Sequence, residues 1–124
     1  SPDGGALFVT DYENHMIRRV EVATGAVTTI AGSGTWGSAD GVGDAAEFHG
    51  PRSIAISRDG GALFVADQGH GKIRRVEVAT GTDWRGDHAV TTLAGSGEGL
   101  ARWPRSRAAA RMATLMAWAT RRSL

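Results

Sequence analysis

The chain has 124 residues, a formal net charge of +1 and no cysteine, with the balance of apolar and charged residues typical of a folded globular domain. The lack of cysteine excludes disulfides, thiolate nucleophiles and cysteine-based zinc sites, and it leaves the compartment open. No apolar run approaches the roughly 18 residues of a membrane-spanning helix, so we expect no transmembrane segment.

Short runs rich in Val, Ile, Leu, Phe and Thr, separated by turn residues, predict strands rather than helices over the first 97 residues. In chain order the predicted strands cover residues 6–10, 16–22, 27–31, 53–57, 62–66, 72–78 and 90–94. The Asp-Gly-Gly triplets at residues 3–5 and 59–61 predict hairpin turns, because glycine supplies the positive φ that such reversals need.

An internal repeat organises these strands. Residues 57–81 match residues 1–25 at 18 of 25 positions, and residues 89–97 match residues 26–34 at eight of nine. The second match follows once residues 82–88 are treated as an insertion. A repeat unit buries its apolar surface only against its neighbours. The run Ala6-Leu7-Phe8-Val9 is apolar on both faces of a strand, which is typical of a sheet packed between similar sheets.

The predicted fold is therefore all-β: a partial β-propeller of about two four-stranded antiparallel blades, followed by a non-repeat C-terminal tail that is helical or disordered. Blade 1 covers residues 1–31 and lacks its leading strand, a linker covers residues 32–50, and blade 2 covers residues 51–97. Ile17 and Val20 would fall on opposite faces of a regular strand. A β-bulge, or burial of both faces, would reconcile them.

Residues 48–51, 53–57, 59–60, 63–67 and 73–76 together resemble the NHL repeat. That family is named after an Asn-His-Leu-like motif, whose closest counterpart here is Asn14-His15-Met16-Ile17; the second unit departs from it with His70-Gly71-Lys72-Ile73. The resemblance implies a propeller of roughly six blades. At about 40–45 residues per blade a closed ring needs more chain than this, so we expect a fragment, or a chain that associates.

Relatives implied by this resemblance bind mainly protein or RNA, and a minority are peptide-amidating lyases or metal-dependent lactonases. The leading hypothesis is a non-enzymatic scaffold that binds a protein or another macromolecule. The alternative is a fragment of a divalent-metal-dependent propeller hydrolase or lyase. An isolated blade pair exposes both of its flat faces, which predicts self-association.

The candidate site lies on one rim of the blades. Because the strands alternate in direction, the turns at residues 11–15 and 67–71 and the linker emerge on the same face, and loops on a rigid scaffold are where binding usually resides. The candidate binding residues are Tyr12, Glu13, Asn14, His15, Trp36, Asp40, Asp44, His49, Gln68 and His70.

Asp11 and Asp67 each close a second strand, where lactonase-like relatives would place metal ligands. We favour a local role, in which each side chain caps the following turn through backbone hydrogen bonds. The acidic residues of the linker lack the spacing of an EF-type calcium loop, so an Asp-Gly turn with Phe48 buried as an anchor is expected instead. We predict no cofactor, with calcium or another divalent cation as the open alternative.

The three rim histidines accompany no serine or cysteine nucleophile motif, so we expect them to be exposed or bonded to turns. Arg18-Arg19 and Arg74-Arg75 repeat in register and could face RNA phosphates. However, Glu21 and Glu77 repeat with them, and residues 1–97 carry eight Lys or Arg against twelve Asp or Glu, a net charge of −4. Cross-strand ion pairs on a solvated sheet are therefore expected, and RNA is not the predicted partner.

Residues 98–124 do not continue the repeat and carry six Arg against one Glu. Taken at face value, residues 106–122 form a basic, Ala-rich helix suited to an anionic membrane surface or a partner groove. We favour another hypothesis. Back-translated and read from the third base of each codon, residues 112–119 can spell glycines with the spacing of Gly37, Gly41 and Gly43, which indicates a linker translated out of frame or mis-spliced.

Overall fold

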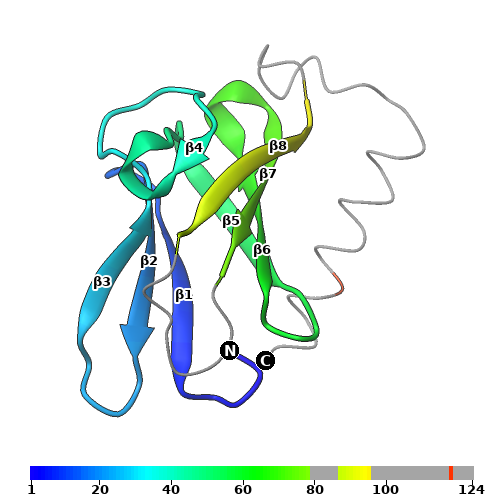
Figure 1. Cartoon of the computed structure of the whole chain (residues 1–124). Coiled ribbons are helices and arrows are strands. Elements are labelled where there is room, and N and C mark those ends of the chain that lie inside the picture. Colours follow the sequence, from blue (N-terminus) through cyan, green and yellow to red (C-terminus); the bar gives the residue numbers. More distant parts are fainter. Residues whose placement is uncertain (79–86, 96–117, 119–124) are drawn as a thin grey trace.

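The computed structural model describes residues 1–78, 87–95 and 118 and shows two antiparallel sheets joined by a long linker (Figure 1). The first sheet has the order β1-β2-β3, with strands β1 (Ala6–Asp11), β2 (Met16–Glu21) and β3 (Val27–Ala31). The second has the order β4-β8-β7-β6-β5, with β4 (Gly41–Val42), β5 (Pro51–Ile56), β6 (Ala62–Asp67), β7 (Lys72–Glu77) and β8 (Ala89–Ala94). Two short 3-10 helices, η1 (Gly43–Ala45) and η2 (Gln68–His70), complete the described elements.

This architecture is the predicted all-β partial β-propeller, in which the first blade lacks its leading strand. Each predicted strand is present, with bounds that shift by at most a residue or two. The linker adds one strand that the sequence did not indicate: β4 pairs with β8, with Gly41 opposite Val90. The predicted insertion and the predicted C-terminal tail lie outside the described residues, except for residues 87, 88 and 118.

The two blades share one register. In the first hairpin Ala6 pairs with Glu21 and Asp11 with Met16. In the second hairpin the corresponding positions, 56 residues later, pair in the same way. Both Asp-Gly-Gly triplets form the predicted turns, with positive φ at Gly4 and Gly60. In each turn the aspartate side chain accepts a hydrogen bond from the backbone N–H two residues on.

A β-bulge is present in both blades, but β2 and β7 pair regularly with β1 and β6, and in blade 2 Ile73 and Val76 are reconciled by the other alternative, burial of both faces. Ile17 pairs with Ala31 whereas Arg18 pairs with Thr29, so Ile30 has no partner across β2. The same slip occurs between β7 and β8. The unpaired residue therefore sits on the fourth strand rather than on the strand whose pattern suggested it.

The core lies between the two sheets. Phe8, Ile17 and Ile30 of blade 1 pack with the aliphatic residues of blade 2 that face them. These are Ile54, Ile56, Leu63, Val65, Val76 and Val90. Ala46 and Phe48 of the linker belong to the same cluster, so the linker is part of the core. Within the described part of the chain, no helix is long and apolar enough to cross a membrane.

One face of blade 1 is uncovered. Successive residues of a strand point to opposite faces, so Leu7, Val9, Val20 and Val27 share the face that looks away from blade 2; we call it the open face. Leu7 is 57% exposed and Val9 41%, whereas their counterparts Leu63 and Val65 are 0% exposed. The repeat thus shows the same side chains with and without a neighbouring blade.

The linker and the β6–β7 turn lie at one end of the sheets, and the β2–β3 and β5–β6 turns lie at the other (Figure 1). This is the arrangement expected from alternating strands. It brings the linker and the turns that follow β1 and β6 to a common rim.

Replacing Leu63 with alanine is expected to lower the free energy of unfolding by about 2–5 kcal/mol, because this side chain is fully buried between the sheets. Leu7→Ala makes the same change at the matching exposed position and is expected to cost less than about 0.5 kcal/mol. Urea unfolding followed by circular dichroism measures both. Equal losses in the two variants would show that the open face is covered in solution.

Candidate functional site

One buried arginine holds the linker against blade 2. The side chain of Arg74, on β7, is 0% exposed. Its Nη1 donates to the carbonyl oxygen of Glu47 at 2.8 Å and to Oδ2 of Asp67 at 3.1 Å. Its Nη2 donates to the carbonyl oxygen of Ala39 at 2.8 Å and to Oδ1 of Asp40 at 2.9 Å. We call Arg74 with Asp67 and Asp40 the Arg74 clasp.

The clasp fixes the end of the linker that enters the rim. Oδ1 of Asp67 accepts a hydrogen bond from the backbone N–H of His49 at 2.7 Å. The guanidinium of Arg74 lies 5.1 Å from the ring centroid of Phe48, and Phe48 is fully buried as the predicted anchor. A charge taken out of water needs such partners, since a buried charge left unpaired is strongly destabilising.

Asp40 joins the clasp to β8. Its Oδ1 accepts from the Thr92 hydroxyl at 2.8 Å, and its Oδ2 accepts from the Thr92 backbone N–H at 3.1 Å. Partial burial acts to raise the pKa of Asp40, but the hydrogen bonds from Thr92 and the charge of Arg74 outweigh it. The pKa of Asp40 therefore lies below its ordinary value of 3.8, and the carboxylate is the form that the structure stabilises.

The expected cross-strand ion pairs are present, but with aspartate rather than glutamate as the partner: Arg18 pairs with Asp11 and Arg74 with Asp67. Arg19 pairs with Glu21, and Arg75 with Glu77, along the same strand rather than across it. Arg74 is buried, because adjacent residues of a strand point to opposite faces and only one of the two arginines can remain on the outer side. The two arginines of each neighbouring pair therefore lie on opposite faces of their sheet.

The expectation that Asp67 caps the turn after it is wrong. Asp67 is the residue before η2, yet its side chain makes no capping hydrogen bond there. Both of its oxygens serve Arg74 and the linker instead. Asp11 accepts from the side-chain amide of Asn14 at 2.9 Å, so it does bond within its turn, but not to the backbone.

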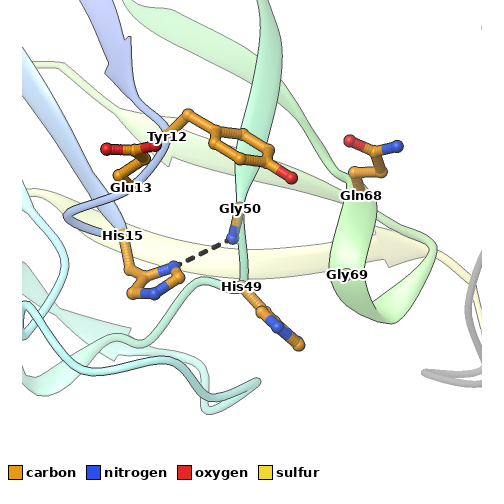
Figure 2. Close-up of a pocket in the computed structure, with 7 residues that line it drawn as sticks. All are labelled: Tyr12, Glu13, His15, His49, Gly50, Gln68 and Gly69. Carbon is orange, nitrogen blue, oxygen red and sulfur yellow. Dashed lines mark hydrogen bonds between the residues drawn. The ribbon is translucent and has the colours of Figure 1, made fainter.

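An open pocket of about 590 Å³ lies where the linker meets the two rim turns. Figure 2 shows its seven lining residues, which come from blade 1, the linker and blade 2. They are Tyr12, Glu13, His15, His49, Gly50, Gln68 and Gly69. We call this hollow the rim pocket. The turns and the linker that were predicted to share one rim meet in it, and its role in binding stays a prediction.

His15 has an unusual backbone conformation. It adopts a φ of 57°, where a residue with a side chain is uncommon, and the matching position of blade 2 is Gly71 with a φ of 59°. The imidazole compensates by accepting a hydrogen bond at Nδ1 from the backbone N–H of Gly50, 3.0 Å away (Figure 2). Blade 1 thus accepts a strained residue at a turn where its duplicate uses glycine.

His49 is the centre of an aromatic group. Its ring centroid lies 4.8 Å from that of His70, 5.8 Å from that of His15 and 5.2 Å from that of Trp36. All three histidines are half-buried. The expectation of exposed or turn-bonded histidines is therefore wrong: none of the three is fully exposed, and the hydrogen bond of His15 reaches the linker rather than its own turn.

Two glycines let the chain segments come close together at the pocket. A Cβ on Gly50 would lie 2.9 Å from the ring of Tyr12, and a Cβ on Gly69 would lie 2.3 Å from the ring of His49. The Gly69 N–H also donates to the His49 carbonyl at 2.7 Å. Neither glycine was predicted as a site residue, and no sequence signal separated them from the other turn glycines.

The remaining predicted residues lie around the pocket rather than in it. Asn14 bonds to Asp11, Asp40 belongs to the clasp, and Asp44 is exposed on η1. Within residues 1–78, 87–95 and 118, no three His, Asp or Glu side chains are grouped closely enough to hold a metal ion. A divalent cation at Asp11 or Asp67 stays a prediction.

Fold and site together define a partial β-propeller with an aromatic pocket on its rim. No protein-family model matches the chain. The chain is 31% identical over 122 residues to NHL repeat-containing protein 2 of Bos taurus, a match that covers 90% of this chain and 16% of that protein. It is 32% identical over 99 residues to NHL repeat-containing protein 2 of Homo sapiens, covering 74% of this chain and 13% of that protein.

A third relative is the Arabidopsis thaliana Protein SUPPRESSOR OF QUENCHING 1, chloroplastic, which is 37% identical over 79 residues, covering 64% of this chain and 7% of that protein. The chain thus spans less than a fifth of the length of each of these relatives. Together the matches support an NHL-like relationship and agree with the propeller architecture.

Asp67→Ala is expected to lower the free energy of unfolding by about 3–5 kcal/mol, because it leaves the buried charge of Arg74 short of a partner. The matched control is Asp11→Ala, whose side chain is 28% exposed and lies 3.7 Å from Arg18; it is expected to cost at most about 1 kcal/mol. Chemical denaturation of both variants measures the difference. A similar loss in each would mean that the clasp does not depend on Asp67.

Asp40→Asn is expected to flatten the acid limb of the stability profile. Because the folded state lowers the pKa of Asp40, its carboxylate stabilises the fold above the unfolded pKa, and this contribution is lost as the pH falls through the folded pKa. Denaturation at several pH values between about 6 and about 3 should show a steeper loss in the native chain than in the variant. Parallel curves would exclude this role for Asp40.

Proposed function

We propose that the chain is an NHL-repeat propeller segment and a non-enzymatic interaction scaffold, whose rim pocket binds a segment of a protein partner. The observation that carries this proposal is the exposure of two large aromatic side chains beside the pocket. Trp36 is 65% exposed and Tyr12 49%. Tyr and Trp are the residues that most often anchor protein interfaces, since each offers a large apolar ring and a polar atom.

The polar groups of the pocket suit a peptide ligand. Gln68 Oε1 accepts a hydrogen bond from Arg52 Nη1 at 3.0 Å, which orients the amide and leaves its NH2 group as a donor. Glu13 offers a carboxylate on the opposite side, and the tyrosine hydroxyl offers both a donor and an acceptor. An open hollow with aromatic walls and a few polar groups is the usual form of a binding pocket.

The differences between the two repeats support the same assignment. Of the seven positions at which residues 1–25 differ from residues 57–81, five are consecutive, at residues 12–16 and 68–72. The first four of each set form the rim turns and the fifth begins β2 or β7, whereas the other sheet residues are nearly unchanged. Sheet residues are constrained by packing, while turn residues on a rigid scaffold are free to take the shape of a ligand.

A protein partner fits the charge better than RNA does. Residues 1–97 carry a net charge of −4, and the repeated arginines of the sheets are engaged in ion pairs with acidic residues. RNA binding depends on cationic side chains that are available to phosphates. The proposal therefore commits to a polypeptide ligand.

Peptides selected from a random phage-displayed library on the full chain should depend on the rim aromatics. Trp36→Ala and Tyr12→Ala are each expected to weaken a selected peptide by about tenfold or more, the effect of losing an interface anchor of about 1.4 kcal/mol or more. Fluorescence anisotropy of the labelled peptide measures the affinity.

Asp44→Ala is the matched control, because Asp44 is exposed on the neighbouring η1 but does not line the pocket. Peptides whose binding ignores both aromatics would overturn the pocket assignment. Calorimetric titration of the full chain with calcium and with zinc addresses the hydrolase or lyase alternative. A tight site that depends on Asp11 or Asp67 would favour that alternative over the scaffold.

A further inference from the structure

A side-chain hydrogen bond ties the rim turn of blade 1 to the linker at the rim pocket. The backbone N–H of Gly50 donates to Nδ1 of His15 over 3.0 Å (Figure 2). A backbone N–H can only donate, so Nδ1 is the acceptor and carries no proton. The imidazole of His15 is therefore neutral in this structure, with its proton on Nε2.

Protonation of His15 is incompatible with this bond. An imidazolium carries a proton on both ring nitrogens and has no acceptor left. Two N–H groups would then face each other at Nδ1. Gly50 is buried, and a buried N–H without an acceptor is unfavourable. His15 can therefore keep this bond or gain a proton, but it cannot do both.

The bond maintains a turn that is otherwise strained. His15 has a φ of 57°, which is uncommon for a residue with a side chain. Another polar contact between the two blades, from the Thr10 hydroxyl to the Arg52 carbonyl, is longer at 3.4 Å. The ring of Tyr12 lies on Gly50, where an added Cβ would be 2.9 Å from it. Loss of the His15 bond would therefore release the turn, and Tyr12 with it, from Gly50.

The basic groups near His15 oppose a positive charge on it. His49 of the linker packs edge-on against His15, with ring centroids 5.8 Å apart, and His70 of η2 packs on the other side of His49 at 4.8 Å. A proton on either of these rings would disfavour a second one nearby. Arg52 adds a permanent positive charge at the blade 2 wall of the pocket, where it binds Gln68.

The acidic groups on the same turn do not hold an imidazolium in place. Asp11 is engaged with Arg18 and Asn14. Glu13 lines the pocket but is exposed, where the attraction between two charges is weak. The other titratable group of the turn is the phenol of Tyr12, and phenols are uncharged near neutral pH. The described residues therefore give a protonated His15 no substitute for its bond to Gly50.

We propose that His15 is a pH-sensitive latch between the rim turn of blade 1 and the linker. Neutral His15 holds residues 11–15 against Gly50 and so fixes the blade 1 wall of the rim pocket. Uptake of one proton by His15 breaks the bond, and the turn separates from Gly50. The latch concerns the shape of the pocket itself, so it does not depend on the proposed function.

The direction of the pH effect follows from proton linkage. The released turn binds one proton more than the latched turn, so a falling pH favours release. Histidine side chains change charge between about pH 8 and about pH 5, and carboxylates stay ionised above about pH 5. The latch is therefore expected to open on mild acidification, in a range where histidines titrate and carboxylates do not.

The test uses nuclear magnetic resonance of the full chain, labelled with the heavy nitrogen isotope at glycine and histidine. At about pH 7.5, where histidines are mostly neutral, the ring nitrogen shifts of His15 should show a proton on Nε2 and none on Nδ1. The protection of the Gly50 amide against hydrogen exchange, corrected for the intrinsic rate, should then fall on acidification. Once His15 is protonated, we expect a loss of about tenfold per pH unit, the slope of a single proton.

Variants of His15 separate the proton from the hydrogen bond. His15→Asn keeps an acceptor oxygen, tolerates positive φ and cannot gain a proton, so the Gly50 amide should stay protected down to about pH 5. His15→Gly relieves the strain, as Gly71 does in blade 2, but removes the acceptor, so Gly50 should be poorly protected at every pH. His70→Gln is the matched control, because it removes another imidazole of the same group and should leave the response of Gly50 intact.

Four results would overturn the proposal. The first is a proton on Nδ1 of His15 at neutral pH. The second is a Gly50 amide whose protection does not change between about pH 7.5 and about pH 5, where histidines titrate. The third is a native-like pH response in His15→Asn. The fourth is loss of the response in His70→Gln, which would assign the responsible proton to His70.

Discussion

The hydrogen bonds of Arg74 to two linker carbonyls and two carboxylates are the interaction on which the rest of the structure depends. A guanidinium with no exposure to water needs hydrogen-bond acceptors, and here four acceptors from three separate segments bind its two Nη groups, while its Nε has no partner. The linker can therefore take only a narrow range of paths across blade 2. Trp36 and His49 reach the rim because the residues between them are held in this way.

The clasp adds specificity of path more than net stability. Burying an ion pair costs desolvation that the attraction of the charges only partly repays, and an apolar group of the same shape is often as stable. An apolar side chain in place of Arg74, however, could not donate hydrogen bonds to the linker. The backbone carbonyls of Ala39 and Glu47 would then lose the partner that they have in this structure. The buried charge therefore costs desolvation energy, but its hydrogen bonds fix the path of the linker and with it the positions of the rim residues.

Most of the fold could be predicted from local pattern. Strand positions, the Asp-Gly-Gly turns and the burial of Phe48 all follow from periodicity and turn chemistry within a few residues. The burial of Arg74 could not be predicted in the same way, because it depends on a blade and a linker that come from elsewhere in the chain. A signal did exist: Asp11 precedes Arg18, and Asp67 precedes Arg74, by the same seven residues, and hairpin pairing places each pair on one face.

The candidate site could be predicted less fully than the fold. The sequence pattern placed the turns on one rim, but the positive φ of His15 and the contacts of Gly50 and Gly69 depend on three segments meeting.

The duplicated blades show that sequence identity and environment are separable. Leu7 and Leu63, or Arg18 and Arg74, occupy the same register in nearly identical hairpins, yet Leu7 is exposed and Arg18 half-buried, whereas Leu63 and Arg74 are fully buried. The difference in exposure comes from the neighbouring segments that pack on each blade.

The rim turns behave in the opposite way, because their backbones share one position in the blade while their side chains differ. At one such position His15 takes the left-handed conformation that Gly71 takes in blade 2, at the cost of strain. Glycine would relieve that strain, so the side chain of His15 must provide something that glycine cannot, and in this structure it is the bond to Gly50 that joins the blade 1 turn to the pocket wall.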